Sequence, residues 1–336
     1  MYVRRFLHLV LFCLIVGPVQ ANPPVPDPKP LPLDKRVRKL PPVSAKSLFK
    51  SVEQGAALKP AVHGYYTRGC LAGAVKLEND GPAWQAMRLS RNRHWAHPNM
   101  IRLVKKLAVE AQQHDGWVGL LVGDLSMPRG GPMPPSHASH QVGLDADIWL
   151  TPMPKRRLSR SEREKLSATF TLTKNQLAVN PKVWTSAHGK LIKRAASYRE
   201  VQRILVHPAI KKRLCETAGD DRAWLSKVRP VRGHNYHFHI RLRCPPGSPG
   251  CRGQKAPVSD DGCGAELDRW YKWLHARLKP KPKRKTPRKP RKKRPPMTLA
   301  DLPRACTSVL RAENALRVPK PRLATPRTAN PGPAKQ

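Results

Sequence analysis

The stretch HNYHFHIRL (234–242) holds three of the chain's 13 histidines, at positions 234, 237 and 239. Its apolar residues predict a β-strand over 238–242. Successive side chains of a strand point to opposite faces, so His237 and His239 share one face, about 6.5 Å apart along the strand. His234 precedes the strand, on a loop from which its ring could reach the same place. A His-x-His pair by itself only weakly indicates a metal site.

A second stretch, SHASHQVGLDADIWL (136–150), strengthens the hypothesis of a metal site. Six residues separate His140 from Asp147, and Gly143 permits a tight bend between them. One carboxylate and two imidazoles commonly hold a zinc ion whose fourth position stays open to water. The alternative is two unrelated polar strand ends. The pattern therefore predicts a three-ligand metal site built from both stretches.

The composition shows that the 336 residues do not fold as one uniformly compact body. Hydrophobic residues make up 39% of the chain, but it also holds 37 prolines and carries a formal charge of +42. Blocks of like charge and clustered prolines favour disorder. We predict six segments: a signal peptide at 1–21, a Pro-rich lead-in at 22–44, a globular domain at 45–277, a disordered basic insert at 278–298, a C-terminal segment at 299–318 and a disordered tail at 319–336.

The first residues have the features of a secretory signal. Arg4 and Arg5 precede the apolar run 6–16, which is too short to span a membrane, and Val19-Gln-Ala21 is a small-residue cleavage site. The mature chain would then be exported, without a membrane span. Cleavage also removes Cys13, one of seven cysteines, and leaves six for three disulfides whose pairing the composition does not fix. No CxxC pair is present, so a zinc finger is not indicated.

Periodicity predicts an α+β domain, with a small antiparallel sheet flanked by helices and long loops, stapled by disulfides and followed by a disordered Pro/Lys-rich tail. The expected helices are at 99–113, at 208–215 and, as a pair joined near Asn180-Pro181, within 158–200. The expected strands are at 116–125, 145–150, 201–206 and 238–242.

Longer motifs resemble a known family. The matching words are RLSRNRHWAHPNMIRLVKKLA (88–108), RGGPMPPSHASHQVGLDADI (129–148), HPAIKKRLCETAGDDRAWLSKVRP (207–230), HNYHFHIRLRCP (234–245) and DGCGAEL (261–267). The pattern H-x(6)-D followed by H-x-H is typical of the lysostaphin, D-Ala-D-Ala metallopeptidase and hedgehog group. Within that group, the chain is most similar to the penicillin-insensitive murein endopeptidases, over about residues 63–270.

The resemblance implies roles for the clustered residues. His140, Asp147 and His239 match the family's zinc ligands. His237 matches an active-site histidine beside the metal, and His234 matches its partner on a loop.

Three further residues, close in sequence to the predicted ligands, also have expected roles. His137 matches a histidine that can also contact metal in relatives. Asp145 is expected to support the site rather than to bind metal. Arg129, on the loop before the first ligand, is expected to bind a substrate carboxylate. Where relatives offer Asp-x-x-His to an additional metal, this chain reads Asn175-Gln-Leu-Ala178, so a second metal is not expected.

The implied activity is that of a periplasmic zinc endopeptidase (cofactor Zn²⁺). It would cut the D-alanyl–meso-diaminopimelyl cross-bridge of peptidoglycan, without a serine for penicillin to acylate. The family also implies a homodimer and a set of disulfides: Cys70–Cys306, Cys215–Cys263 and Cys244–Cys251.

Two other functions are alternatives: nucleic-acid binding, which the high positive charge suggests, and peptidoglycan binding by the same fold without catalysis. A basic chain is by default a candidate for nucleic-acid binding, but the export signal and the absence of a recognisable nucleic-acid module argue against a specific nucleic-acid partner. A non-catalytic peptidoglycan-binding protein would normally have lost a ligand, and none is missing here. We instead expect the basic run at 279–294, eleven Lys and Arg in sixteen residues, to hold the enzyme near the polyanionic wall.

Overall fold

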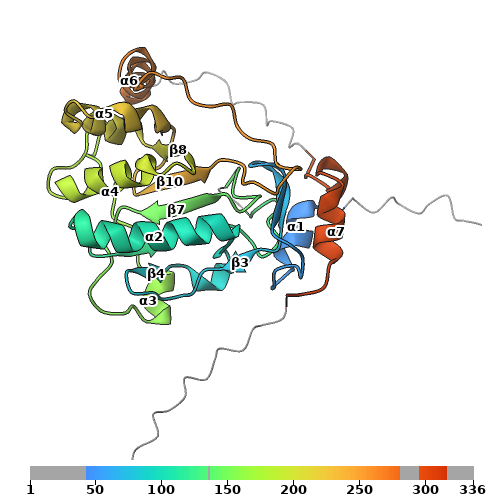
Figure 1. Cartoon of the computed structure of the whole chain (residues 1–336). Coiled ribbons are helices and arrows are strands. Elements are labelled where there is room, and N and C mark those ends of the chain that lie inside the picture. Colours follow the sequence, from blue (N-terminus) through green and yellow to red (C-terminus); the bar gives the residue numbers. More distant parts are fainter. Residues whose placement is uncertain (1–42, 135–136, 281–294, 316–336) are drawn as a thin grey trace, which may run out of the picture. The chain divides into compact units, whose positions relative to one another are not determined.

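A computed structural model describes residues 43–134, 137–280 and 295–315. Figure 1 shows a sheet at its centre. In spatial order the six strands are β4 (Trp84–Ala86), β6 (Leu120–Val122), β7 (Asp145–Trp149), β10 (His237–Leu242), β8 (Val201–Val206) and β9 (Val228–Pro230). Two small two-stranded sheets accompany it: β1 (Ala61–Tyr65) with β2 (Arg68–Ala72), and β3 (Val75–Lys76) with β5 (Trp95–Ala96).

The α+β prediction is confirmed, with a refinement at the sheet edges. The four central strands β6, β7, β10 and β8 pair antiparallel, as expected. The edge strands β4 and β9 instead pair parallel with β6 and β8. These short edge strands were not predicted, because three residues are too few to show a period.

The helices among the described residues are α1 (Ala45–Lys50), α2 (Pro98–His114), α3 (Arg160–Lys165), α4 (Ser186–Ser197), α5 (Pro208–Thr217), α6 (Ala265–Leu278) and α7 (Ala305–Arg311), with short 3₁₀ turns η1 (Leu89–Arg91), η2 (Ala223–Lys227) and η3 (Leu299–Asp301). The predicted helices at 99–113 and 208–215 correspond to α2 and α5. Both begin alike: a histidine accepts a hydrogen bond at the N-cap and proline takes the first helical position.

The pair of helices predicted within 158–200 is shorter than expected. The helices α3 and α4 form, but residues 166–185 between them adopt turns and a bridge between Leu172 and Val179. This stretch is rich in threonine and contains Pro181, and both residue types disfavour a helix interior.

The helices α2 and α4 cover one face of the central sheet (Figure 1). Both helices contribute to one core with the inward residues of β7 and β10, which are Ala146, Ile148, Phe238 and Ile240. The alternating residues of the same strands therefore lie on the opposite face: Asp145, Asp147, Trp149, His237, His239 and Arg241. Strand alternation thus separates a hydrophobic face from a polar one.

A second core fixes the C-terminal segment. Residues of α1, β2 and α7 pack together there, with Phe49 and Val309 among the buried side chains. The disulfide Cys70–Cys306 joins β2 to α7, and Cys215–Cys263 and Cys244–Cys251 are also present. These are the pairs that the family resemblance implied.

Arg129 does not line the active-site groove, and the prediction of a substrate contact is corrected here. Its side chain is buried, and its guanidinium donates to the carbonyls of Val309 and Leu310 at 2.8 and 2.7 Å and to Asn314 Oδ1 at 2.9 Å. The two carbonyls belong to the end of α7, where backbone acceptors have no partner within the helix. Arg129 therefore caps α7.

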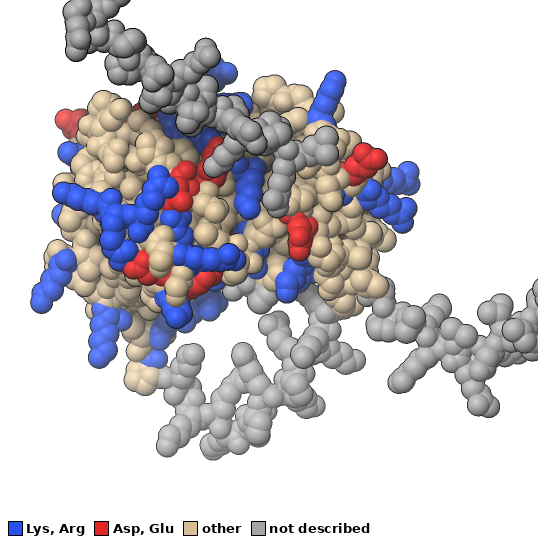
Figure 2. Space-filling model, turned by 90° about the horizontal axis from the view of Figure 1, so that it is seen from below, with Lys and Arg blue, Asp and Glu red and all other residues tan. Residues whose placement is uncertain are grey.

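Several predicted segments fall outside the described residues. These are the signal peptide, nearly all of the Pro-rich lead-in, the basic run 281–294 and the tail beyond 315. Within the described ranges, no helix combines the length and apolarity needed to cross a membrane. On the face drawn in Figure 2, Lys and Arg side chains are spread out with Asp and Glu between them, rather than gathered in one stripe.

Replacing Arg129 tests its structural role. Arg129→Met should lower the free energy of unfolding by about 2–3 kcal/mol, because it leaves buried carbonyls without donors. The measurement is denaturant unfolding followed by tryptophan fluorescence, with Arg102→Met on the exposed face of α2 as the matched control. Equal stability of the two variants would show that Arg129 does not hold α7.

Candidate active site

The register of two neighbouring strands creates the site. The antiparallel pairing of β7 with β10 places Asp147 directly opposite His239 and Trp149 opposite His237. His239 Nδ1 lies 3.0 Å from Asp147 Oδ1. Two residues about ninety positions apart in the chain therefore meet on the polar face of the sheet.

His140 reaches this pair from the loop before β7. It adopts a left-handed backbone (φ 68°), and Gly143 does so as well (φ 66°), which confirms the predicted bend. A side chain at Gly143 would collide with Leu71 and with the backbone of His97. Asp145 Oδ2 accepts the backbone N–H of His140 at 2.9 Å and so holds the turn in place.

Both histidines have one ring nitrogen engaged away from Asp147. The Nδ1–H of His140 donates to the carbonyl of Leu125 at 2.5 Å, which turns Nε2 toward Asp147 at 3.4 Å. His239 Nε2 donates to Asp145 Oδ1 at 3.0 Å, which turns Nδ1 toward Asp147. Histidines that bind metal usually have their second nitrogen held in this way.

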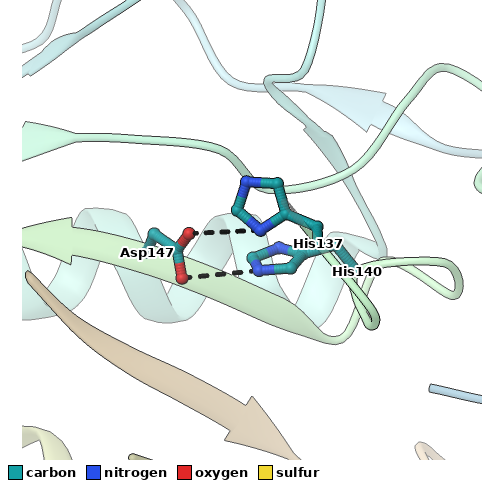
Figure 3. Close-up of side chains that lie close together, drawn as sticks. All are labelled: His137, His140 and Asp147. Atoms are coloured by element: carbon teal, nitrogen blue, oxygen red, sulfur yellow. Dashed lines mark ion pairs between the residues drawn. The ribbon is translucent and has the colours of Figure 1, made fainter. Parts of the chain in front are cut away.

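His137 also faces Asp147, from the same loop as His140 (Figure 3). Its Nε2 donates to Asp124 Oδ2 at 2.9 Å, and its Nδ1 lies 3.8 Å from Asp147 Oδ2. One ligand atom from each of His137, His140 and Asp147 falls within 4.8 Å of the others, so these three could also hold a metal ion.

His237 lies beside the same carboxylate but is oriented differently. Its Nε2 is 3.7 Å from Asp147 Oδ1, while its Nδ1 is buried without a hydrogen-bond partner among the described residues. The ring of His234 lies 4.8 Å from that of His237, centroid to centroid, on a left-handed residue (φ 57°) just before β10. The site therefore brings together every histidine that was predicted for it.

Two donor separations in this cluster are those expected around a tetrahedral metal ion. With metal–ligand bonds of 2.0–2.2 Å, two ligand atoms of a tetrahedral zinc are about 3.3 Å apart. Asp147 Oδ1 lies 3.0 Å from His239 Nδ1 and 3.4 Å from His140 Nε2, close to that separation. The nitrogen of His137 is farther from the carboxylate, at 3.8 Å.

The charges of the site also favour a cation. Burial opposes ionisation of Asp147, but His140 and His237 outweigh it and hold its pKa well below the usual value. Burial likewise disfavours charged His239, yet Asp145 and Asp147 outweigh it and raise its pKa. The protein thus stabilises positive charge between these carboxylates. Burial lowers the pKa of His237, which favours a neutral ring.

Two cavities open on either side of Asp147. The larger, of about 820 Å³, is lined by His140, His234 and His239. The smaller, of about 280 Å³, extends past Trp149 to Arg88. Asp147, His137, His237, Tyr236 and Arg91 line both. A polypeptide substrate could therefore lie across the candidate metal position.

Asp124 is a site residue that the sequence analysis missed. It follows β6 at the end of the run GWVGLLVGDL, and its Oδ2 accepts from His137, Arg93 and Arg91. An acidic residue just after a buried strand is an available signal, but it does not indicate which histidine it meets.

The convergent His/His/Asp donors define a candidate metal site on the polar face of the sheet. The family model for "Penicillin-insensitive murein endopeptidase" matches residues 62–311, so the chain belongs to that family and is a peptidase. It is similar to proteins of that name from Haemophilus influenzae (45% identity; 62% of this chain, 72% of the relative) and Pectobacterium atrosepticum (39%; 82% and 92%). The protein of that name from Yersinia enterocolitica is 41% identical (71% and 86%).

Asp145 is predicted to support the metal site without binding metal. Asp145→Asn should weaken zinc binding about 10–100-fold, because this side chain orients His239 and also holds the His140 turn. Competition with a chromophoric chelator measures the affinity, and far-UV circular dichroism checks that the variant folds. Asp268→Asn, on the exposed side of α6, is the matched control. Equal zinc affinities of Asp145→Asn and Asp268→Asn would show that Asp145 does not support the metal site.

Proposed function

We propose that the chain is a zinc metalloendopeptidase that hydrolyses D-alanyl–meso-diaminopimelyl cross-bridges of peptidoglycan. The observation that carries the proposal is the convergence of two nitrogens, His239 Nδ1 at 3.0 Å and His140 Nε2 at 3.4 Å, on the same carboxylate oxygen, Asp147 Oδ1. We assign these three as the ligands. His137, at 3.8 Å, is assigned to the rim of the site.

A bound zinc ion supplies Lewis-acid chemistry, which polarises a carbonyl and makes a water nucleophile available near neutral pH. The chain's own residues move the protons. Burial lowers the pKa of His237 and so favours its neutral ring, and its Nε2 faces the ligand cluster, so it can take a proton from the attacking water. The peptide C–N bond then breaks as the same nitrogen returns the proton to the departing amine. The water oxygen remains on the new carboxylate.

His234 supports this transfer from the loop side. Its ring lies 4.8 Å from that of His237 and 5.8 Å from that of His239, at the wall of the larger cavity. Burial and the two neighbouring imidazoles lower its pKa to about 3. It is therefore neutral, and because its Nδ1–H donates to the carbonyl of Arg232 at 3.2 Å, its Nε2 is left as an acceptor that can orient the attacking water. The nucleophile is water rather than serine, which accounts for insensitivity to penicillin.

Other parts of the proposal extend beyond the site. An exported chain would act in the periplasm, where peptidoglycan is its substrate and the disulfides are stable. The family resemblance suggests a homodimer, which light scattering on the mature chain would test. A role for the basic run 279–294 in wall retention would show as weaker co-sedimentation with sacculi after its deletion.

Digestion of purified sacculi tests the activity. The zinc-loaded mature chain should convert cross-linked muropeptide dimers to monomers, as followed by chromatography, and EDTA should abolish the conversion. The cleaved bond, identified by mass spectrometry, decides between D,D and L,D specificity. Unchanged dimers after treatment with the zinc-loaded chain would leave wall binding without catalysis as the remaining function.

His237 should matter for turnover but not for metal content. His237→Ala is expected to lower kcat about 10²–10⁴-fold, the usual contribution of a general acid–base group, while zinc stoichiometry stays at the wild-type value. His114→Ala, on the exposed end of α2, is the matched control. If His237→Ala loses its zinc, the residue is a ligand and the proposed division of roles is wrong.

A further inference from the structure

The 280 Å³ cavity beside Asp147 and His237 has a defined chemical character. Two large side chains form its walls, Trp149 with 6% of its surface exposed and the more exposed Tyr236. Two guanidinium groups, of Arg88 and Arg91, lie at its edge. Asp124 and His137 also line it, and the other lining residues are small: Gly123, Ser167 and Ala168. The cavity is therefore a short slot next to the reacting atoms, lined by two arginines and by the carboxylates of Asp124 and Asp147.

The two arginines have different roles. Arg88 is fixed in the wall: its guanidinium lies over the ring of Trp149, 5.6 Å from the ring centroid, and donates to the carbonyl of Leu166 at 2.8 Å. Among the described residues, the Arg91 side chain makes one hydrogen bond, from Nη1 to Asp124 Oδ2 at 3.1 Å. A guanidinium has five N–H donors, so most donors of Arg91 remain available for a ligand.

Asp124 does not need Arg91 to balance its charge. The same carboxylate oxygen accepts from Arg93 at 2.8 Å and from His137 at 2.9 Å. The side chain of Asp124 is 3% exposed and that of Arg93 is 11% exposed, whereas that of Arg91 is 46% exposed. Arg91 is thus anchored at one nitrogen and presents the rest of its fork to both cavities.

We propose that Arg91 is a specificity-determining residue, which binds the substrate carboxylate adjacent to the scissile peptide bond. This inference rests on the proposed function. When a D-alanyl–diaminopimelyl bond is cut, the residue that supplies the peptide nitrogen carries a free α-carboxylate. A planar guanidinium matches a carboxylate through two parallel hydrogen bonds. Arg91 would orient the leaving amine beside His237 and select against substrates that carry an amide at this position.

A matched pair of probes tests the inference on the zinc-loaded mature chain. The first is a reduced-amide analogue of N-acetyl-D-alanyl-meso-diaminopimelate, in which CH₂–NH replaces the scissile peptide bond so that it cannot be hydrolysed. The second is identical except that the carboxylate next to this nitrogen is a carboxamide. Calorimetry at about 0.15 M salt, which screens long-range attraction by the basic chain, gives both Kd values.

The wild-type chain should bind the acid at least about tenfold more tightly than the amide, a difference that one charge-assisted hydrogen-bonded pair supplies. Arg91→Gln should reduce this ratio to about one, and Arg91→Lys should keep part of it. Arg102→Gln changes the net charge equally on the exposed face of α2 and should keep the full ratio.

Three results would overturn the role of Arg91: equal wild-type affinities for the two probes, binding of neither probe, or an unchanged ratio in Arg91→Gln. Because the readout is binding, these results are separate from the digestion of sacculi. If the chain digests sacculi but does not prefer the acid probe, the proposed function stands and the role of Arg91 is wrong. If the chain prefers the acid probe but leaves sacculi intact, the proposed function is wrong while the binding role of Arg91 stands.

Discussion

The pairing of Asp147 with His239 across adjacent antiparallel strands is the constraint on which the site depends. The register of β7 and β10 brings a carboxylate and an imidazole to 3.0 Å on the polar face of the sheet. The opposite face of the same strands packs in the core with α2 and α4, so the register cannot slip by one residue without burying these polar groups. The hydrophobic core thus fixes the geometry of the chemistry.

A few hydrogen-bonding groups extend this geometry to the surrounding histidines. Asp145 binds Arg241, His239 and the backbone of His140, so one buried carboxylate connects the strand pair to the loop that carries the next histidine. Asp124 and the Leu125 carbonyl orient His137 and His140. The Nδ1 of His237 is buried without a hydrogen-bond partner among the described residues, so no second group fixes the proton on this ring.

The sequence indicates which residues share a face but not which residues meet. Alternation along the strand correctly grouped His237 with His239, and the glycine at 143 correctly marked the bend. The direct opposition of Asp147 and His239 depends on register between distant segments, which neither segment encodes alone. Arg129 shows the same limit: its acceptors lie some 180 residues later, and a carbonyl at a helix end has no sequence signature.

The most direct test of this account is a crystal structure of the zinc-loaded mature chain with an anomalous map at the zinc edge. The account predicts one strong peak bonded to His140 Nε2, Asp147 and His239 Nδ1, at about 2.0–2.2 Å. In that structure Asp145 would still accept from His239 Nε2, and His137 would remain on Asp124. A zinc ion bound by His137, His140 and Asp147, with His239 still bridging the two carboxylates, would contradict the account.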